Sequence, residues 1–281
     1  KKSWSSGNVR WSSYVGGCFA IISRKLWDNE DKFLNSLLKL IIKYRQERPV
    51  DGVIIDLDAS QLVDNSEETV ETFLQSISSL RNKLLAVQNQ TQMNFPTYVI
   101  FSNCEKITGF SSLKTLLAPE DLSKVMGIVG SSGSGALVSL DAIDADFQCI
   151  VENMNLMATN AIIDAELGET RKEEVFVFGC KLDKFFKNAK RVLSEIYPFN
   201  SSEFAGELRS VALLGSDSNR IKKNVRQLFS KDLFQSIIFQ EANRAKPVEA
   251  ALRTTTINVS NANAISIFLL LILPQNQFHQ F

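Results

Sequence analysis

Short apolar runs alternate with amphipathic segments along the first hundred residues. The runs Gly17–Ile22, Gly52–Leu57 and Thr97–Phe101 are rich in β-branched and aliphatic residues and begin at glycine or follow proline, which is typical of strands buried on both faces. Between them, Asp31–Glu47 and Glu67–Gln90 repeat apolar residues every three or four positions, which predicts amphipathic helices. This alternation predicts an α/β fold with a mostly parallel sheet flanked by helices.

Helical periodicity dominates the middle of the chain. Apolar residues recur in steps of four and three from residue 143 to residue 161, and a second stripe runs from residue 182 to residue 196, just before Pro198. We interpret both stripes as the core-facing sides of helices. The helix-rich part of the chain is therefore expected at about residues 105–200, as a helical insertion in the α/β domain.

A late apolar run, Ser210–Leu214, is predicted as a strand that ends in Gly215–Ser218, and a last amphipathic helix is predicted from about Ile221 to Phe239. A strand after so many helices can return to the first sheet, which favours one domain over two. We expect it to share one central sheet with Gly52–Leu57 and Thr97–Phe101, and these two to be parallel and adjacent or nearly so.

The C-terminal tail carries no charged side chain from Thr254 to Phe281, and Ala264–Leu273 is apolar except for Ser266. Ten residues are about half of the roughly 20 that a membrane helix needs. The run fits a hydrophobic tail or a buried strand, and it also fits the start of a transmembrane helix, because basic residues precede it. We adopt the last interpretation, with residues 1–253 as the domain and 254–281 as a tether and helix start.

Composition excludes several functions. The 281 residues include 31 basic and 31 acidic side chains, which argues against a nucleic-acid-binding stripe. The single histidine, His279, excludes mechanisms built on a histidine base or on several histidine ligands. The four cysteines are widely spaced with no Cys-x-x-Cys pair, and we predict reduced core thiols.

Candidate chemistry lies at the ends of the predicted strands, because ligands of open α/β sheets bind at the carboxyl edge. Asp56 follows the apolar residues of its strand, where it is either a weak candidate for contacting Mg²⁺ or a polar residue that starts a turn. The glycine-rich segment Gly130–Gly135 lacks the Gly-Lys-Ser/Thr ending of a phosphate-binding loop, so we interpret it as a solvent loop.

The segment after the next strand looks like the base-reading loop of GTP-binding proteins, Asn/Thr-Lys-x-Asp. In that loop the carboxylate accepts the guanine N–H groups, and the stem of the lysine packs on the base. Here Asn103 stands in place of the lysine and Glu105 in place of the aspartate. We therefore treat Asn103 and Glu105 as a degenerate cofactor-binding loop, and we expect no tight GTP binding.

From about Arg10 to Leu252 the chain resembles the IcmF/TssM family, inner-membrane components of bacterial type VI and type IVB secretion systems. The most specific segment is FPTYVIFSNCEKITGF, Phe95–Phe110, which is similar to the family's FPVYVLFTKCDLIAGF. Three further segments agree in the same order, and they are RPVDGVII (Arg48–Ile55), LRSVALLGS (Leu208–Ser216) and KDLFQSIIFQEA (Lys231–Ala242).

The resemblance implies a P-loop-NTPase-like domain on the cytoplasmic side of the bacterial inner membrane, with transmembrane helices adjacent to it. It also implies other secretion proteins as partners, among them a DotU/TssL-type inner-membrane protein. This sequence departs from the family where it has no G-x-x-x-x-G-K-S/T motif, and where Ile21–Trp27 stands in place of a DTAGRY-like switch.

Three functions stay open. The first is a structural, docking role in the secretion complex, with a degenerate nucleotide site, no catalytic residues, and neither metal nor cofactor. The second is an active or regulatory GTPase that uses GTP and Mg²⁺ and whose Walker A motif lies upstream of Lys1. The third is a soluble interaction domain unrelated to secretion. The missing phosphate cradle, switch aspartate and base-reading lysine favour the first, because phosphoryl transfer depends on positioning and charge stabilisation.

Overall fold

An eight-stranded sheet forms the centre of the computed structural model, which describes residues 2–6, 9–14, 17–22, 31–63, 66–130, 139–163, 168–197, 206–219, 224–248 and 266–272. Its strands β3, β12, β4, β6 and β8 run parallel, and antiparallel strands complete both sides. In spatial order the strands are β1 (Lys2–Ser6), β2 (Val9–Tyr14), β3 (Gly17–Ile22), β12 (Ser266–Ile272), β4 (Gly52–Asp58), β6 (Pro96–Ser102), β8 (Glu207–Leu213) and β7 (Met126–Val129).

The predicted parallel core is confirmed. Strand β6 lies between β4 and β8 and is parallel to both, with Val99 opposite Ile55 on one side and Val211 on the other. The late strand therefore returns to the first sheet, as its apolar sequence predicted. Side chains of these strands are buried on both faces of the sheet, which explains why their sequences are apolar runs with little alternation.

The C-terminal apolar run differs from the membrane-helix interpretation. Ser266–Ile272 forms strand β12, which lies between β3 and β4 and is parallel to both. Seven residues suffice for a strand across a sheet, whereas a membrane helix needs about 20. The strand alternative is therefore the one that the structure shows for Ser266–Ile272, and the expected tether at residues 254–265 lies outside the described residues.

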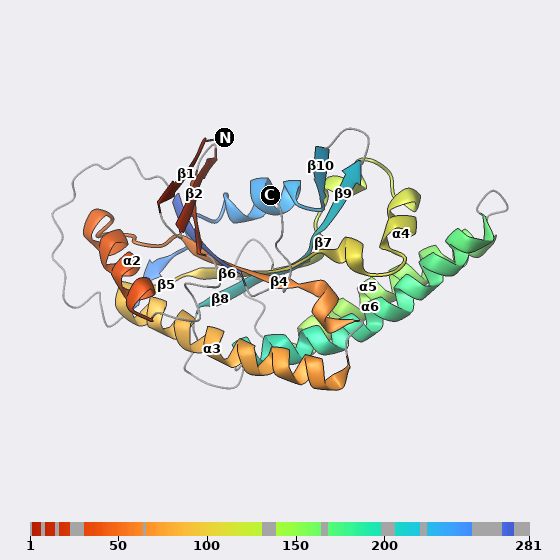
Figure 1. Ribbon diagram of the computed structural model, residues 1–281, viewed down its shortest axis with the longest axis horizontal. Coiled ribbons are helices and arrows are strands. Elements are labelled where there is room, and N and C mark those ends of the chain that lie inside the picture. Colours follow the sequence, from red (N-terminus) through yellow and green to blue (C-terminus); the bar gives the residue numbers. More distant parts are fainter. Residues whose placement is uncertain are drawn as a thin grey trace.

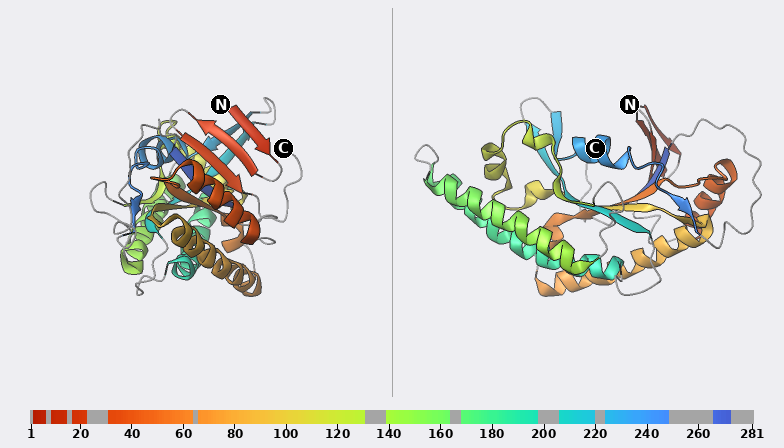
Figure 2. Two further views of the ribbon diagram at one scale, coloured as in Figure 1. Left: turned by 90° about the vertical axis from the view of Figure 1, so that its left-hand side faces the viewer. Right: turned by 180° about the vertical axis from the view of Figure 1, so that it is seen from behind.

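Helices α3 (Glu67–Thr91), α5 (Leu140–Ile163) and α6 (Glu169–Ile196) cover one face of the sheet, and the short helix η4 (Leu233–Ile238) lies on the other face (Figures 1 and 2). Helices α5 and α6 form a long antiparallel hairpin that extends beyond the sheet, with α4 (Phe110–Leu116) beside it, and α2 (Asp31–Tyr44) lies at the opposite end of the molecule. The shorter elements are η1 (Ala59–Leu62), η2 (Cys104–Lys106), η3 (Asp121–Ser123), β5 (Met93–Asn94) paired with β11 (Lys246–Pro247), and β9 (Gly215–Asn219) paired with β10 (Asn224–Leu228).

Helix α3 shows why the sequence forms a helix here. The side chain of Ser66 accepts a hydrogen bond from the backbone N–H of Thr69, and Glu67 and Glu68 follow in the first turn, which is the arrangement that stabilises a helix N-terminus. Its buried residues recur every three or four positions. Gln92, in a left-handed conformation at φ 53°, ends the helix.

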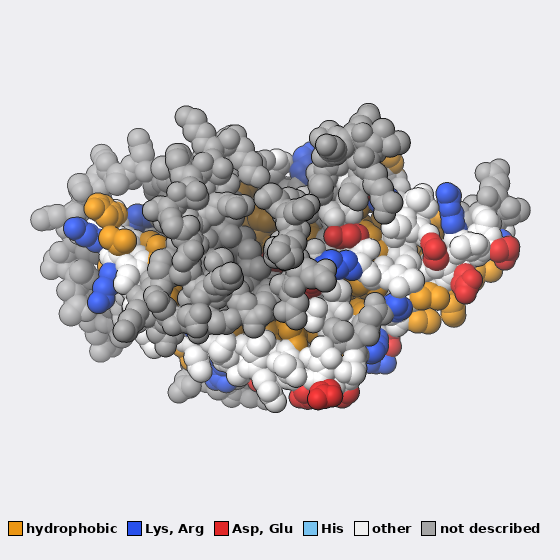
Figure 3. All heavy atoms as spheres, in the orientation of Figure 1, with side chains coloured by type: hydrophobic (Ala, Val, Ile, Leu, Met, Phe, Trp, Pro, Cys, Tyr) orange, Lys and Arg blue, Asp and Glu red, His pale blue; other side chains and the backbone are white. Residues whose placement is uncertain are grey.

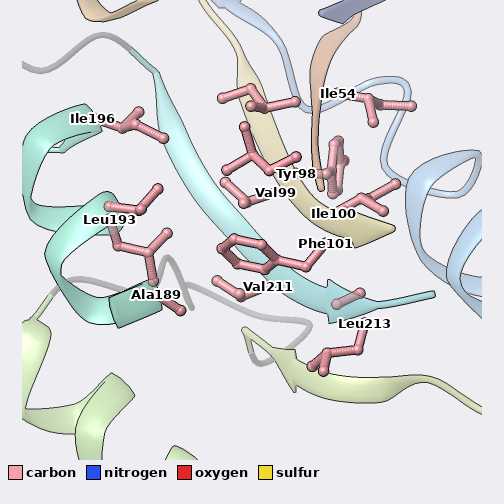
Figure 4. Packing of buried hydrophobic residues seen from close by; sticks show 14 of the residues in the cluster. Ile54, Tyr98, Val99, Ile100, Phe101, Ala189, Leu193, Ile196, Val211 and Leu213 are labelled. Carbon is pink, nitrogen blue, oxygen red and sulfur yellow. The ribbon is translucent and has the colours of Figure 1, made fainter. Parts of the chain in front are cut away.

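The core between α6 and the sheet is built from one face of each parallel strand. In Figure 4, Val99 and Phe101 of β6 point toward Ala189, Leu193 and Ile196 of α6, whereas Tyr98 and Ile100 point to the opposite face. The ring of Phe101 meets that of Phe185 edge to face, with the centroids 5.0 Å apart. Packing of this kind fixes α6 against the sheet.

The predicted last helix, Ile221–Phe239, is wrong over its first half. Asn224–Leu228 is strand β10, which pairs with Gly215–Asn219 in an antiparallel ribbon. Phe229 adopts φ 62° directly after β10, and this left-handed residue separates the ribbon from the following helical turn η4.

The cysteine prediction is confirmed in part. Cys104, Cys149 and Cys180 are free thiols, but only Cys104 is buried, whereas Cys149 and Cys180 lie exposed on α5 and α6. They occupy the outer faces of an amphipathic helix pair, where a small side chain is tolerated. The side chain of Cys18 lies outside the described residues.

Candidate functional site

Polar residues gather at the carboxyl edge of the parallel strands, as the strand-end argument predicted. Asp56 and Asp58 lie at the end of β4, and Asn103 and Glu105 follow β6. Ser216, the second residue of β9, lies three residues after the end of β8. Since β4, β6 and β8 are neighbours and parallel, these segments meet at one edge of the sheet, where ligands of α/β folds bind.

The Glu105 carboxylate is engaged within the chain. Its Oε2 atom accepts a hydrogen bond of 2.8 Å from the backbone N–H of Ser216. A base-reading carboxylate must instead offer its oxygens to the N–H groups of the base. The contact ties the loop after β6 to the start of β9, so Glu105 acts here as a bridge between two strand ends.

The rest of this loop is also anchored to β8. The backbone N–H of Cys104 donates to the carbonyl of Leu214 at 3.1 Å, and the N–H of Leu214 donates to the carbonyl of Phe101 at 2.8 Å. Asn103 adopts a left-handed conformation with φ 61° and ψ 32°, and its side chain makes no capping hydrogen bond. Burial raises the pKa of the Cys104 thiol well above its usual range, which leaves Cys104 a neutral core residue.

Asp58 is a structural cap. Its Oδ1 atom accepts hydrogen bonds from the backbone N–H of Ser60 at 3.0 Å and from the Ser60 hydroxyl at 2.8 Å. Lys106 contributes an ammonium group 3.5 Å from Oδ2. The buried carboxylate of Asp58 therefore starts the helical turn η1 and is neutralised by a lysine of the loop after β6.

Asp56 is the carboxylate of this edge whose pKa is strongly raised, among the residues the structure describes. Burial raises the pKa of Asp56 to about 6; a hydrogen bond with Ser102 works in the opposite direction, and the nearby charge of Asp58 adds to the rise. Its Oδ1 atom is buried and finds no hydrogen-bond partner among the described residues. Among the residues that the structure describes, no three His, Cys, Asp or Glu side chains lie close enough together to hold a metal ion.

A second polar cluster, which sequence reasoning did not find, lies on the face of the sheet beneath η4. Arg209 is fully buried, and its Nε atom lies 3.1 Å and 3.0 Å from the two carboxylate oxygens of Glu241. The Arg209 Nη2 atom lies 2.5 Å from Glu241 Oε1. The hydroxyl of Tyr98 donates to the same carboxylate at 2.9 Å, and burial and this carboxylate keep the pKa of Tyr98 above its usual range.

A β-bulge directs Arg209 into this cluster. Thr97 pairs with Leu208 and Tyr98 pairs with Ser210, so Arg209 is the extra residue of β8 at this point. A bulge re-aims one side chain while the rest of the strand keeps its register. The positive charge of Arg209 thereby reaches the same face as Tyr98.

Arg48 connects the entry of β4 to the same C-terminal segment. Its Nη1 atom donates to Asn243 Oδ1 at 2.7 Å, and its Nε atom lies 2.6 Å from the fully buried Asp51. Arg45 lies 2.9 Å from the other oxygen of Asp51. Two guanidinium groups thus compensate the buried carboxylate that precedes β4.

These contacts assign structural roles to the segments that carry the family resemblance. Tyr98, Arg209 and Glu241 come from three of those segments and meet in one buried network. In the first of them, Gly109 has φ +92°, and a Cβ atom there would lie 2.0 Å from the carbonyl oxygen of Glu174. Only glycine allows α6 to approach this closely.

Two other regions of interest lie outside the described residues. They are residues 23–30, which include most of the position expected for the switch motif, and residues 131–138, which include most of the glycine-rich loop. The signal for the buried network was present in the sequence as an arginine inside an apolar strand and a glutamate after an apolar helix. The sequence alone does not show that this arginine and this glutamate pair.

The fold and the carboxyl edge of the sheet define the class of this protein. It is an α/β domain with a mostly parallel sheet and a helical hairpin insertion. At its carboxyl edge, the loop after β6 is bonded to the end of β4 and to the start of β9. The IcmF-related N-terminal domain matches residues 28–260, and the chain belongs to this family. No curated protein and no solved structure matches the chain.

Family membership identifies the chain in general terms as a component of type VI or type IVB secretion, which works within a complex of several proteins. Proteins of the IcmF family are inner-membrane proteins. Among the helices of the described residues, none is both long enough and apolar enough to cross a membrane.

Proposed function

We propose that this domain is a cytoplasmic scaffold of the secretion complex, which docks other components and has a degenerate nucleotide site. The observation that carries the proposal is the hydrogen bond between Glu105 and the backbone N–H of Ser216. It engages the only carboxylate that stands where a GTPase would read the base. Asp58, the nearest carboxylate on β4 to this loop, is neutralised by Lys106.

The chemistry of phosphoryl transfer supports the same conclusion. Such sites work through positioned cations, backbone donors and a metal that stabilise charge on the phosphates. The chain contains no phosphate-loop motif, and the Asn103 position lacks the lysine of the base-reading loop. A domain of this kind retains the nucleotide-binding architecture as a surface for other proteins, of which a DotU/TssL-type inner-membrane protein is the expected partner.

Nucleotide titration tests the proposal directly. We expect the full 281-residue chain to show no saturable binding of fluorescently labelled GTP with Mg²⁺ at micromolar concentrations. Glu105→Ala should leave that result unchanged while lowering the melting temperature, because Ser216 loses its acceptor. Glu120→Ala serves as the matched control, since Glu120 is exposed in a loop. Micromolar or tighter binding that Glu105→Ala abolishes and Glu120→Ala preserves would establish the GTPase alternative instead.

Docking is tested with the partner of the same secretion system. A tagged chain, co-expressed with the DotU/TssL-type protein and extracted in mild detergent, should retain that protein through size-exclusion chromatography. A nucleotide-free chain that fails to retain it would contradict the scaffold role. Retention that requires added GTP would indicate a regulatory switch.

A further inference from the structure

Helix α2 has a buried apolar face that packs in the core and an outer face that carries both apolar and basic side chains. The inner face is formed by buried Leu34, Leu37, Leu38 and Ile41. On the outer face Leu40 is 54% exposed and Tyr44 is 77% exposed. They are four residues apart and therefore lie on adjacent turns of one side of the helix. Exposed apolar side chains that lie side by side are a feature of interaction surfaces.

Two lysines accompany these apolar side chains. Lys39 and Lys43 are exposed and also four residues apart, and the Lys43 ammonium lies 5.6 Å from the centre of the Tyr44 ring. Neither lysine has a carboxylate partner among the described residues. Glu47, the next carboxylate along the chain, comes after the end of the helix. The outer face of α2 is thus positively charged and apolar at the same time.

We propose that the outer face of α2, formed by Lys39, Leu40, Lys43 and Tyr44, rests on the surface of an anionic membrane. Interfacial helices combine apolar side chains that enter the headgroup region with lysines that contact anionic lipid. Tyrosine suits this position because its ring is apolar and its hydroxyl is polar. The proposal is independent of the scaffold function, which concerns protein partners.

Position and family favour a membrane over an acidic protein. Helix α2 lies at one end of the molecule, away from the α5–α6 hairpin (Figure 1). Proteins of the IcmF family are inner-membrane proteins, so a bilayer lies within reach of this domain. In Figure 3, apolar and basic side chains gather at this end.

Exposed apolar side chains also lie on the α5–α6 hairpin, and Leu156 on the acidic helix α5 provides an internal control. Leu156 of α5 is 60% exposed, and Ile162, Ile163 and Phe176 are exposed on the same hairpin. Helix α5 carries four acidic residues and neither lysine nor arginine. An anionic surface should therefore repel α5 around Leu156, although Leu156 is about as exposed as Leu40 of α2.

Vesicle flotation with the full chain separates these contributions. The probes are vesicles of phosphatidylcholine alone and vesicles that also contain phosphatidylglycerol. We expect the chain to bind the anionic vesicles more tightly, and binding to weaken as salt screens the charges. Lys39→Gln/Lys43→Gln should weaken binding to the anionic vesicles by about tenfold or more, and Leu40→Ser/Tyr44→Ser should weaken binding to a similar extent. Leu156→Ser, which removes an equally exposed leucine from the acidic helix, should bind as the unmodified chain does.

Several results would overturn the proposal. They are an absence of binding to anionic vesicles, equal binding to both kinds of vesicle, and binding that both α2 variants retain. A loss with Leu156→Ser equal to that with Leu40→Ser/Tyr44→Ser would also overturn it, because the charge of the patch would then be irrelevant. Binding of the chain to polyglutamate but not to vesicles would show that α2 recognises an acidic protein. Because all substituted side chains are exposed, a thermal melt should show folded variants.

Discussion

Replacement of Asp56 by asparagine should stabilise the protein at neutral pH. Burial raises the pKa of Asp56 from 3.8 to about 6, so the folded chain binds a proton more tightly than the unfolded chain does. The free energy of unfolding therefore falls as the pH rises from about 4 to about 6, and the loss persists above pH 6. Asparagine has the same shape, keeps an acceptor for Ser102, and carries no charge at any pH.

The expected gain follows from the size of the shift. The pKa of Asp56 differs by about two between the folded and unfolded states, which corresponds to roughly 3 kcal/mol of the free energy of unfolding at neutral pH. The side chain of Asp56 retains partial exposure, which allows water to reach the carboxylate, so we expect about 1 to 2 kcal/mol. Near pH 3.5 the carboxyl group is protonated in the folded chain, and the variant and the unmodified protein should be almost equally stable.

Urea denaturation at pH 3.5, 5, 6 and 7.5, chosen to span the titration of Asp56, measures this difference. Asp146→Asn is the control, because Asp146 is an exposed carboxylate on α5. Asp56→Asn should raise the urea midpoint at pH 7.5 and remove part of the decline between pH 4 and 6, whereas the control should do neither. A variant that is less stable at pH 7.5 would refute the reasoning and would show that the negative charge of Asp56 is used.

Two further substitutions test the buried polar contacts. Glu241→Ala leaves the buried Arg209 without its carboxylate and should lower the free energy of unfolding, measured by urea denaturation, by about 3 to 5 kcal/mol. Arg209→Met/Glu241→Leu should recover a large part of that loss, because no buried charge is left unpaired. A double variant no more stable than the single one would contradict this explanation. Asn188→Ala removes the 2.8 Å hydrogen bond from Nδ2 to the carbonyl of Leu62 and should lower the free energy of unfolding by about 1 to 3 kcal/mol. Ser194→Ala removes an exposed hydrogen bond and should leave the free energy of unfolding almost unchanged in the same assay.

The parallel core could be predicted because its signal is local. The buried strands β4, β6 and β8 are short apolar runs, and α3 combines a serine cap with regular apolar spacing. Both patterns depend on neighbouring residues and on nothing distant. The loop after β6 was likewise located correctly at the carboxyl edge, because parallel strands bring their ends together.

The errors arose where distant contacts decide the structure. Residues 224–228 have apolar spacing that fits a helix or a strand, and pairing with Gly215–Asn219 selects the strand. The apolar run at Ser266–Ile272 is similarly ambiguous, and the position between β3 and β4 determines its form. The hydrogen bond from Ser216 to Glu105 joins residues 111 positions apart, and no periodicity along the chain reports such a contact.

The buried network of Tyr98, Arg209 and Glu241 has an evolutionary consequence. Because each member satisfies the others away from water, a change at one position exposes an unpaired charge or hydroxyl at another. We therefore expect the three positions to change together among relatives, because replacing all three by apolar residues leaves no unpaired group. The segments that contain Tyr98, Arg209 and Glu241 thus attach the residues that follow η4 to the sheet.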